Sequence, residues 1–341
     1  MIVTRNDVAT AAGVSPSTVS YVLNDGPRRV STETKKRVWS AIRKLGYHPN
    51  AIARSLRTQR VGMVGLIVPD IANPFFAGVS RGAQDVAREK GYFVVVCNTD
   101  GVFEQEIELI QSLYEHRMEG IIVAPAGASQ KNLQFLLDRG VPIVLFGREE
   151  IAEDTIVDCV GIDDTAAAYD AVNHLLSEGH SSIALITGPL VKGRMSHRLE
   201  GYRRALVERG IAYRDELVVS GNYLQESGYR SAAELLGRAA RFSAVFATND
   251  LMAIGAMMAF QEKGLRIPED IAIIGFDNIA ESKVTTPKLS TIDNPNYMQG
   301  KVSAEMLFAR IGEQRRAPPR AVILSHKLVV RDSTRRGMCE T

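Results

Sequence analysis

The chain has 341 residues, of which 45% are hydrophobic, and its formal net charge is only +2. A chain of this length can bury large cores and is expected to form two or three domains. No uninterrupted apolar stretch approaches the length of a membrane-spanning helix, and Arg5 and Asp7 interrupt any apolar N-terminal run, which argues against a secretory leader.

The cysteines and histidines do not indicate a metal site. Cys97, Cys159 and Cys339 lie far apart, and neither they nor the 6 histidines have the spacing of metal ligands. The cysteines are also odd in number, which argues against a disulfide framework. We therefore expect a cytoplasmic protein that contains no metal and no other cofactor.

The near-neutral total charge conceals an uneven distribution. Residues 1–60 contain eleven lysines and arginines but only three acidic residues, a net charge of +8, so that residues 61–341 carry −6. A concentrated positive segment is typical of a domain that binds nucleic-acid phosphates. The sequence therefore indicates a basic head that binds DNA and an acidic body.

Residues 7–24 predict two short helices around a tight turn. Gly13 is suited to end the first helix in a left-handed conformation, and Ser15 is suited to cap the second. Because Ser17 and Tyr21 are four residues apart, they share one face of the second helix. This is the spacing of a helix-turn-helix motif, although an ordinary helical hairpin has the same spacing.

A third helix is expected over residues 32–45, with Ser31 as its cap and Gly46 at its end. The following segment begins at Pro49 and is too short to form a stable free helix. From its length alone, the expected structure is a disordered linker.

From Val61 onward, short apolar runs alternate with helical stretches, which is typical of βαβ units with parallel sheets. The predicted strands are 63–68, 92–97, 120–124 and 142–146 and, in a second set, 182–187, 217–219, 244–247 and 271–276. The predicted helices are 74–90, 103–116, 131–139, 164–178, 196–209, 225–238 and 250–263. Two such sets predict two doubly wound lobes, whose ligands bind outside the carboxyl ends of the strands.

Several short motifs are shared with a single protein family. They are Asp7–Ala9, Ala12–Ser15, Thr18–Ser20, Leu23–Asn24, Val30–Ser31, Gly46–Tyr47, Pro49–Asn50 and Ala53–Leu56. With these motifs the chain resembles the LacI/GalR family of bacterial repressors over nearly its whole length. The resemblance implies a small all-α helix-turn-helix headpiece followed by a two-lobed, doubly wound α/β core like that of periplasmic binding proteins.

The resemblance also implies domain boundaries. The headpiece would comprise residues 1–48, the hinge segment 49–60, and the effector-binding and dimerisation core 61–341. The family fold crosses between its lobes three times, here near 160–163, 290–294 and 320–325. The first lobe would comprise about 61–161 and 294–320, and the second about 162–290 and 324–335.

Residues of the headpiece and hinge are implied to bind operator DNA. They are Ser15, Pro16, Ser17, Thr18, Ser20, Tyr21, Asn24, Asn50, Arg54, Leu56 and Arg57. Pro16, Ser17 and Tyr21 would contact bases, whereas the other headpiece residues are suited to phosphate contacts, which position the protein. The resemblance also implies that the hinge becomes a helix only on DNA, in the dimer. There Leu56 would insert into the minor groove and help to kink it.

Polar and aromatic residues near the ends of the predicted strands are candidates for binding an effector. They are Asp70, Asn73, Phe75, Phe76, Arg148, Arg198, Tyr223, Asn249, Asp277 and Asn294. Aromatic rings can stack on a sugar, and arginine and asparagine present donors and acceptors at fixed geometry. The set resembles that of ribose-type sugar-binding proteins, except that Gly147 stands where relatives often place an aspartate. Each residue also has a structural alternative, as a helix cap or as part of the core.

These features predict a ligand-responsive transcriptional repressor that binds a pseudo-palindromic operator as a homodimer. A monosaccharide is the expected effector, and a purine or other metabolite acting as corepressor stays open. The C-terminal residues lack apolar heptads, which favours a dimer over a tetramer. We expect no membrane partner. A solute-binding protein would need a leader and no DNA-binding head.

An enzyme is not expected. Gly78–Gly82 fits the G-x-S-x-G pattern, but Ser80 falls inside a predicted helix. A nucleophile elbow needs its serine at the turn between a strand and a helix. The match is therefore interpreted as chance.

Overall fold

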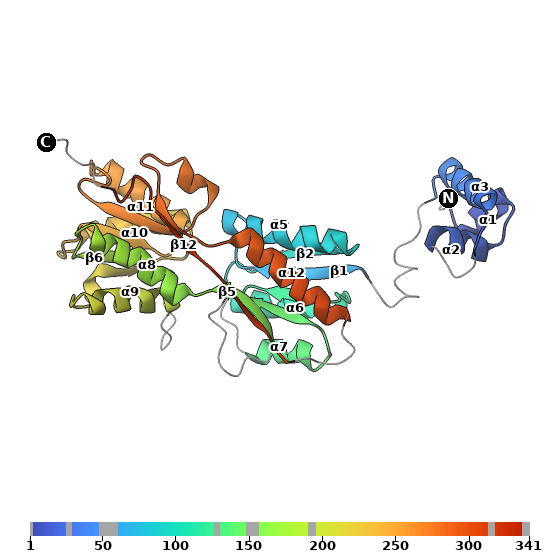
Figure 1. Cartoon of the computed structure of the whole chain (residues 1–341), viewed down its shortest axis with the longest axis horizontal. Helices are drawn as coiled ribbons and strands as arrows, with labels where there is room; N and C mark the ends of the chain where they lie inside the picture. The colour runs from blue at the N-terminus through green and yellow to red at the C-terminus, as the bar shows by residue number, and fades with distance from the viewer. Residues whose placement is uncertain are drawn as a thin grey trace. The chain divides into compact units, whose positions relative to one another are not determined.

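The computed structural model of the chain describes residues 3–24, 29–47, 61–125, 130–147, 157–189, 196–312 and 318–335. The chain divides into two compact units, Met1–Val61 and Gly62–Thr341 (Figure 1). Several predictions fall outside the described residues. These concern the hinge segment with Asn50, Arg54, Leu56 and Arg57, the ligand candidate Arg148, and the C-terminal residues 336–341.

The first unit contains the helices α1 (Arg5–Ala12), α2 (Pro16–Asn24) and α3 (Thr32–Leu45). The cap and helix end predicted for the first helix are both present. Thr4 and Asp7 form a reciprocal capping box on α1, and Gly13 ends that helix with φ of 61°. Val8, Val19 and Val38, one from each helix, are fully buried and hold the three helices together.

The second unit contains two six-stranded sheets, one in each lobe. The first sheet is parallel throughout, in the order β11-β5-β4-β3-β1-β2. Its strands are β1 (Met63–Val68), β2 (Phe93–Asn98), β3 (Ile121–Val123), β4 (Ile143–Phe146), β5 (Asp158–Ile162) and β11 (Ala321–Leu324). Strands β1, β3 and β4 in the interior of the sheet are apolar and almost entirely buried, as is usual for a parallel sheet covered on both faces.

The helices of the first lobe are α5 (Pro74–Glu89), α6 (Phe103–Glu115), α7 (Gln130–Leu137) and α12 (Asn296–Gly312). Helices α5 and α12 pack against each other closely (Figure 1). At Gly82 a Cβ atom would lie 2.1 Å from the Tyr297 carbonyl oxygen, and at Gly300 it would lie 2.0 Å from that of Val79. Only glycine permits this approach.

The second sheet has the order β12-β10-β9-β8-β6-β7, and only β12 runs antiparallel to its neighbour. Its strands are β6 (Ile183–Thr187), β7 (Val218–Ser220), β8 (Ala244–Ala247), β9 (Ala272–Asp277), β10 (Ser290–Asp293) and β12 (Lys327–Val329). The helices of this lobe are α8 (Asp164–Ser177), α9 (His197–Glu208), α10 (Gln225–Gly237) and α11 (Asp250–Glu262), with the 3₁₀ turns η1 (Asp215–Leu217) and η2 (Ala280–Lys283).

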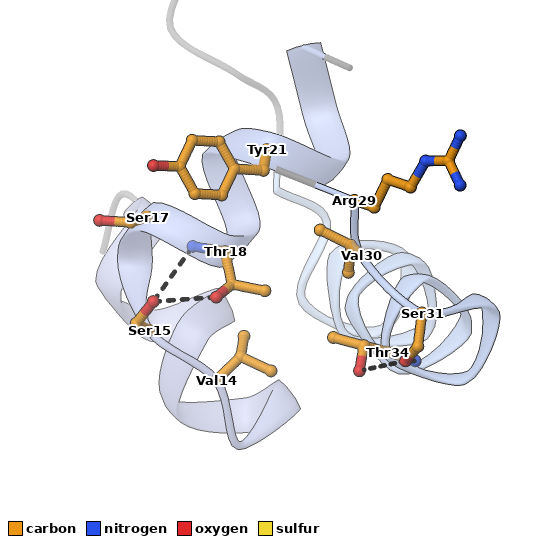
Figure 2. Close-up of a pocket in the computed structure, with 9 residues that line it drawn as sticks. All are labelled: Val14, Ser15, Ser17, Thr18, Tyr21, Arg29, Val30, Ser31 and Thr34. Atoms are coloured by element: carbon orange, nitrogen blue, oxygen red, sulfur yellow. Dashed lines mark hydrogen bonds between the residues drawn. The ribbon is translucent and has the colours of Figure 1, made fainter. Parts of the chain in front are cut away.

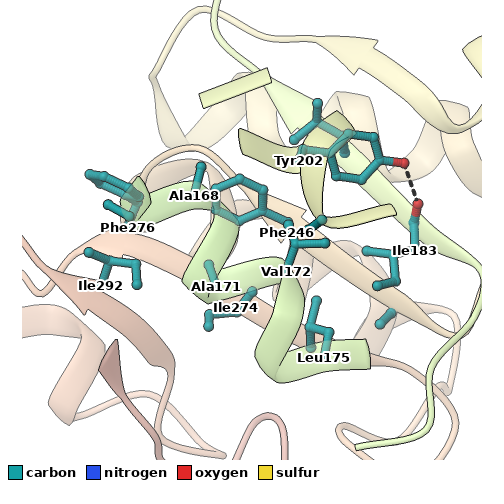
Figure 3. Packing of buried hydrophobic residues seen from close by; sticks show 14 of the residues in the cluster. Ala168, Ala171, Val172, Leu175, Ile183, Tyr202, Phe246, Ile274, Phe276 and Ile292 are labelled. Atoms are coloured by element: carbon teal, nitrogen blue, oxygen red, sulfur yellow. Dashed lines mark hydrogen bonds between the residues drawn. The ribbon is translucent and has the colours of Figure 1, made fainter. Parts of the chain in front are cut away.

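One face of the second sheet forms its largest apolar cluster with α8 and α9 (Figure 3). Phe246 and Phe276 from neighbouring strands pack there with no exposed surface. The buried Tyr202 places its ring in the same cluster and donates its hydroxyl to the Ile183 carbonyl oxygen at 2.8 Å. A buried tyrosine is thus satisfied without disturbing the packing.

The predicted alternation of strands and helices, and with it the two-lobed α/β fold, is confirmed. The chain leaves the first sheet after Ile162, returns between Asp293 and Asn296, and leaves it again after Leu324. Strand β11 belongs to the first sheet, so the returning segment extends four residues beyond position 320. In the described part of the chain, no helix is both long enough and apolar enough to span a membrane.

Candidate functional site

The first candidate surface is a polar groove on the helical unit, with a volume of about 710 Å³. Figure 2 shows its lining, which comes from the turn before α2, from α2 itself, and from the start of α3. The lining residues are Val14, Ser15, Ser17, Thr18, Tyr21, Arg29, Val30, Ser31 and Thr34. Four of the seven DNA candidates of the headpiece lie in it. Pro16 and Ser20 belong to α2 but are not among the lining residues. The prediction for the side chain of Asn24 lies outside what the structure describes.

Local structure determines which groups of this groove remain available. Ser15 accepts the backbone N–H of Thr18 at 3.1 Å, and the two hydroxyl oxygens lie 2.9 Å apart. Ser15 therefore caps α2 as expected, and its hydroxyl is already engaged. Ser17 is exposed and Tyr21 is half-buried, one turn apart on the same helix. These two side chains carry the polar groups best placed to meet a ligand.

Three polar residues of the groove were missed by the sequence analysis: Arg29, Ser31 and Thr34. Arg29 is exposed, and Ser31 accepts the Thr34 backbone N–H at 3.2 Å. The positive charge of the segment was a signal for Arg29, but its placement depends on how the chain turns between α2 and α3. Such a turn cannot be derived from helical periodicity.

In the first lobe, four candidates lie where β1 is followed by α5. Asn73 caps α5 by accepting the Phe75 backbone N–H at 3.0 Å, and Asp70 accepts that of Ala72 at 2.8 Å. Phe75 is only 5% exposed and belongs to the core of the lobe, while Phe76 is half-buried. Their rings meet edge to face with centroids 5.2 Å apart. Asn73 is thus a helix cap and Phe75 is part of the core, which are the structural alternatives that the sequence analysis left open.

In the second lobe, Arg198 in the first turn of α9 is held from three directions. Its Nε donates to Asp164 at 2.8 Å, Nη1 donates to the Thr248 carbonyl oxygen, and the guanidinium carbon lies 3.7 Å from the centre of the Phe276 ring. Burial lowers the pKa of Arg198, but the negative charges of Asp164 and Asp277 outweigh this and raise it. The side chain is therefore a fixed, permanently charged fork.

Asp277 and Asn294 stand beside this arginine at the ends of β9 and β10. Asn294 donates from Nδ2 to Asp277 Oδ1 at 3.1 Å, and both residues are buried. Burial raises the pKa of Asp277 to about 6, although Arg198 and the hydrogen bond from Asn294 oppose the rise. The backbone of Asp277 has φ of 108°, which a non-glycine residue rarely adopts. Such strain is typical of a residue held in place for a function.

Asn249 and Tyr223 are joined to each other. Asn249 caps α11 by accepting the Met252 backbone N–H at 2.9 Å, and it donates from Nδ2 to the Tyr223 carbonyl oxygen at 2.8 Å. Tyr223 has φ of 67° and lies so close to Gly188 that a Cβ there would be 2.0 Å from the tyrosine ring. Its phenol also contributes to the raised pKa of Arg198.

The structure thus brings Arg198, Asp277, Asn294, Asn249 and Tyr223 together at the carboxyl ends of the second sheet. The first-lobe candidates form a separate group. Ile279, two residues after Asp277, is buried in the same apolar cluster as Phe75, so the two groups are on elements that pack together.

Asp164, Thr248 and Phe276 were missed by the sequence analysis. Two adjacent acids at the start of a helix suggest caps, but only Asp163 caps α8, by accepting the Ala166 backbone N–H at 3.0 Å. Asp164 instead pairs with Arg198, which lies 34 residues further along the chain, so its role depends on the fold. A pair of adjacent acids at a helix start was the only signal.

Asp250 lies beneath this site and is fully buried. It accepts the Thr291 hydroxyl at 2.6 Å and the Ile279 backbone N–H at 2.9 Å. Burial and the neighbouring Asp277 raise its pKa well above the usual value for a carboxyl group. These contacts fix the turn that carries Asp277. Within the described ranges, no group of three or more His, Cys, Asp or Glu side chains is arranged to hold a metal ion.

Two known protein families match the chain, one for each of its units. Residues 4–50 match the family described as bacterial regulatory proteins, lacI family. Residues 61–332 match the periplasmic binding proteins and sugar binding domain of the LacI family.

Similar proteins cover almost the whole chain. Catabolite control protein A of Priestia megaterium is 35% identical over 98% of this chain and 100% of its own length. The repressor PurR of Vibrio cholerae is 35% identical over 91% of this chain and 92% of its own.

Two solved structures are also similar over nearly the full length. A complex of the transcriptional regulator CelR with cellobiose has a TM-score of 0.73 at 32% identity and covers 97% of this chain and 99% of its own. The lac repressor dimer, bound to operator and an anti-inducer, has a TM-score of 0.85 at 27% identity and covers 98% and 99%. The chain belongs to the LacI family of DNA-binding bacterial transcriptional regulators.

Proposed function

We propose that this regulator is a repressor that binds a pseudo-palindromic operator as a homodimer. We propose further that a monosaccharide bound at the carboxyl ends of the strands controls it. The observation that carries the proposal is Arg198, which is fixed by Asp164 and the Phe276 ring beside the buried Asp277.

The groove on the helical unit supports the DNA-binding part of the proposal. Ser17 and Tyr21 offer hydroxyl groups to base edges, and Arg29 offers a positive charge to phosphate. The net charge of +8 over residues 1–60 adds a favourable interaction with any DNA sequence. Base contacts would then select the operator, while phosphate contacts hold the headpiece on it. The hinge residues Asn50, Arg54, Leu56 and Arg57 remain proposed DNA contacts.

The edge of the first sheet supports a homodimer. Strand β2 is one of the two edge strands of the described sheet, and its first residue, Phe93, is 76% exposed. Val94, Val95 and Val96 along the same strand are only partly buried. An apolar edge strand promotes association unless it is covered. A second copy related by a two-fold axis would cover it and would place two headpieces on two half-sites.

The polar groups of the second lobe support a monosaccharide. The hydroxyl groups of a sugar both donate and accept, and the site offers both a fixed cation and a carboxylate. Arg198 can donate to a sugar oxygen, while Asp277 in its ionised form accepts from a hydroxyl group. A similar regulator from Enterococcus faecium was solved with ribose, a monosaccharide, and CelR was solved with cellobiose, a disaccharide, so that sugars are bound by both. Asp70, Asn73, Phe76, Asn249 and Tyr223 would complete the site.

A purine is the second candidate effector. Tyr223 is 38% exposed, so that its ring can stack on a flat ligand. PurR repressors are among the similar proteins. A sugar and a purine would both use Arg198, so calorimetry has to separate them.

Control would operate through the two lobes. An effector that contacts both lobes favours one relative arrangement of them, and it shifts the equilibrium only by its difference in affinity for the two arrangements. In a dimer, this changes whether both headpieces fit the operator together. Induction and corepression use the same parts, and the sign of the response is left to experiment.

The test is a binding experiment with the purified full-length protein and the DNA upstream of its own gene. Fluorescence anisotropy is measured with and without pentoses, hexoses, cellobiose and purines, at several salt concentrations. A specific complex that one sugar weakens or strengthens is the expected result. A response to a purine alone would overturn the monosaccharide proposal, and sedimentation that shows only monomers on the operator would overturn the dimer.

A further inference from the structure

A chain of buried hydrogen bonds connects a helix of the first lobe to the carboxylate of Asp277. Gln299, on α12, donates from Nε2 to Asn294 Oδ1, and Asn294 donates from Nδ2 to Asp277 Oδ1 at 3.1 Å. The exposed fractions of the three residues are 2%, 5% and 5%. Water is therefore largely excluded as an alternative partner, and each of these amides depends on the next.

The donors and acceptors in this series of hydrogen bonds follow one order. A carboxamide donates from its nitrogen and accepts at its oxygen, and because both ends have nearly the same shape, its partners decide which way it faces. Gln299 donates to the oxygen of Asn294, so the nitrogen of Asn294 faces Asp277. Without Gln299, the amide of Asn294 loses the partner that holds this orientation. If it turned over, two acceptor oxygens would face each other.

Helix α12 is not free to move alone. Gly300, the residue after Gln299, lies against the backbone of α5, and a Cβ there would be 2.0 Å from the Val79 carbonyl oxygen. Further along α12, Ala304 and Leu307 are buried in the core of the first lobe. If Gln299 moves, α12 and the residues of α5 and of the lobe's core that pack against it have to move as well.

We propose that Gln299 is a positioning residue of the effector site. It holds the Asn294 amide so that it donates to Asp277, and it thereby links the carboxylate that receives the effector to α12 of the first lobe. This inference rests on the proposed function in one respect, that Asp277 receives the effector. The group that Asp277 receives in its ionised form is a hydrogen-bond donor such as a sugar hydroxyl, because a carboxylate only accepts.

The first test needs no effector. The charged groups around Asp277 are Arg198 from α9, Asp164 from α8 and Asp250 from α11. Because the pKa of Asp277 is raised to about 6 in the folded protein, stability falls as pH rises from about 4 through that value. The hydrogen bond from Asn294 opposes the raised pKa, so its loss moves the end of this decline to higher pH.

The experiment measures the thermal unfolding midpoint of the full-length protein between pH 4 and 8. The Asp277→Asn variant lacks the carboxyl group, so its unfolding midpoints show how all other titrating groups depend on pH. Q299M removes the amide at similar volume, and Ser303→Ala is the matched control. Ser303 is buried one turn further along α12, and its hydroxyl makes no hydrogen bond to any residue that the structure describes. We expect Q299M to shift the decline upward by roughly half a pH unit, and Ser303→Ala to leave it in place.

A double variant tests whether Gln299 acts through Asn294. In the Asn294→Ala background, Q299M should change the pH profile no further. An additional shift there, or a Q299M profile that matches the wild type, would overturn the inference. If Q299M does not fold, Q299N keeps a polar amide but shortens the side chain by one methylene, and the same outcomes apply.

Titration calorimetry provides the second readout, with the sugar of the panel that binds the wild type most tightly. Losing one hydrogen bond of about 1 kcal/mol predicts that Q299M weakens binding roughly fivefold. Equal affinities in Q299M and wild type would remove the link to the effector. If no sugar binds the wild type, the proposed effector class fails, while the pH experiment still decides the role of Gln299.

Discussion

The guanidinium carbon of Arg198 lies 3.7 Å from the centre of the Phe276 ring, although the two residues belong to α9 and β9. The ring supports the arginine from a strand of the sheet core, and Asp164 fixes its rotation from α8 at 2.8 Å. An arginine that is stacked and paired in this way loses little conformational entropy when it binds a ligand. The site is therefore largely organised before any effector arrives.

Arg198→Ala is predicted to abolish the effector response while leaving effector-free DNA affinity within about threefold of the wild type. Losing charged hydrogen bonds weakens effector binding roughly 100-fold. The variant also leaves Asp164 buried without its partner, which costs about 3 kcal/mol of stability. Operator binding is followed by anisotropy, with and without the effector. Arg204→Ala serves as control, because Arg204 is on the same helix but forms an exposed pair with Glu208. An intact response in Arg198→Ala would remove the residue from the site.

The headpiece groove predicts two different effects on DNA binding. Arg29→Ala should weaken binding to all DNA sequences and reduce the dependence of log affinity on log salt by about one unit, because one phosphate contact is lost. Tyr21→Phe should weaken operator binding by about 1 kcal/mol and leave the salt dependence unchanged, because a base contact is lost. Titrations of operator and random DNA at four salt concentrations distinguish them. A uniform loss in Tyr21→Phe would mean that its hydroxyl does not recognise sequence.

The close contact of α5 and α12 predicts an effect of a single methyl group. In Gly82→Ala the new Cβ would meet the Tyr297 carbonyl oxygen at 2.1 Å and the Lys301 nitrogen at 2.7 Å, so the helices have to separate. We expect a loss of about 3 kcal/mol in unfolding free energy. In Gly237→Ala no atom lies within 4 Å, and a gain of up to about 1 kcal/mol is expected. Urea unfolding of both variants checks the difference, and equal stabilities would contradict the packing argument.

The sequence predicted the central strands of the sheets well, because there a short apolar run and a buried strand have the same bounds. Strand β8 was predicted residue for residue as 244–247, and its four residues are apolar and buried. Strand β5 was not predicted, because it begins with Asp158. Its carboxylate is neutralised by Arg310 and Arg320, which lie 152 and 162 residues further along the chain. No local pattern can reveal a charge that is paired so far away.

The residues of the candidate site also fall into those that the sequence indicated and those whose role depends on a distant partner. Arg198, Asp277 and Asn294 were accessible to sequence reasoning, because a parallel sheet places ligands at the ends of its strands. The roles of Asp164 and Gln299 were not, because each depends on a partner brought near by the fold. The sequence therefore indicated the residues expected to meet the ligand better than those that hold them in position.

Asp158 itself provides the last prediction. Burial raises the pKa of this carboxyl group, but hydrogen bonds from Arg310 and Arg320 outweigh it, and the net pKa lies below the usual value. A lowered folded-state pKa contributes stability that is present above the unfolded pKa of about 4 and is lost as pH falls through the folded one. Asp158→Ala should lose about 3 kcal/mol at pH 7, because the largely buried guanidinium group of Arg310 loses its carboxylate.

The difference in stability between wild type and Asp158→Ala should then shrink as the solution is acidified below pH 4. Urea unfolding at pH 7, 5, 4 and 3 measures this difference directly. Asp170→Ala is the matched control, since Asp170 is about half exposed and pairs only with His326 in the described structure. A difference that stays constant down to pH 3 would show that Asp158 contributes through packing alone. A shrinking one would assign its effect to the two arginines that bind β11 to the first sheet.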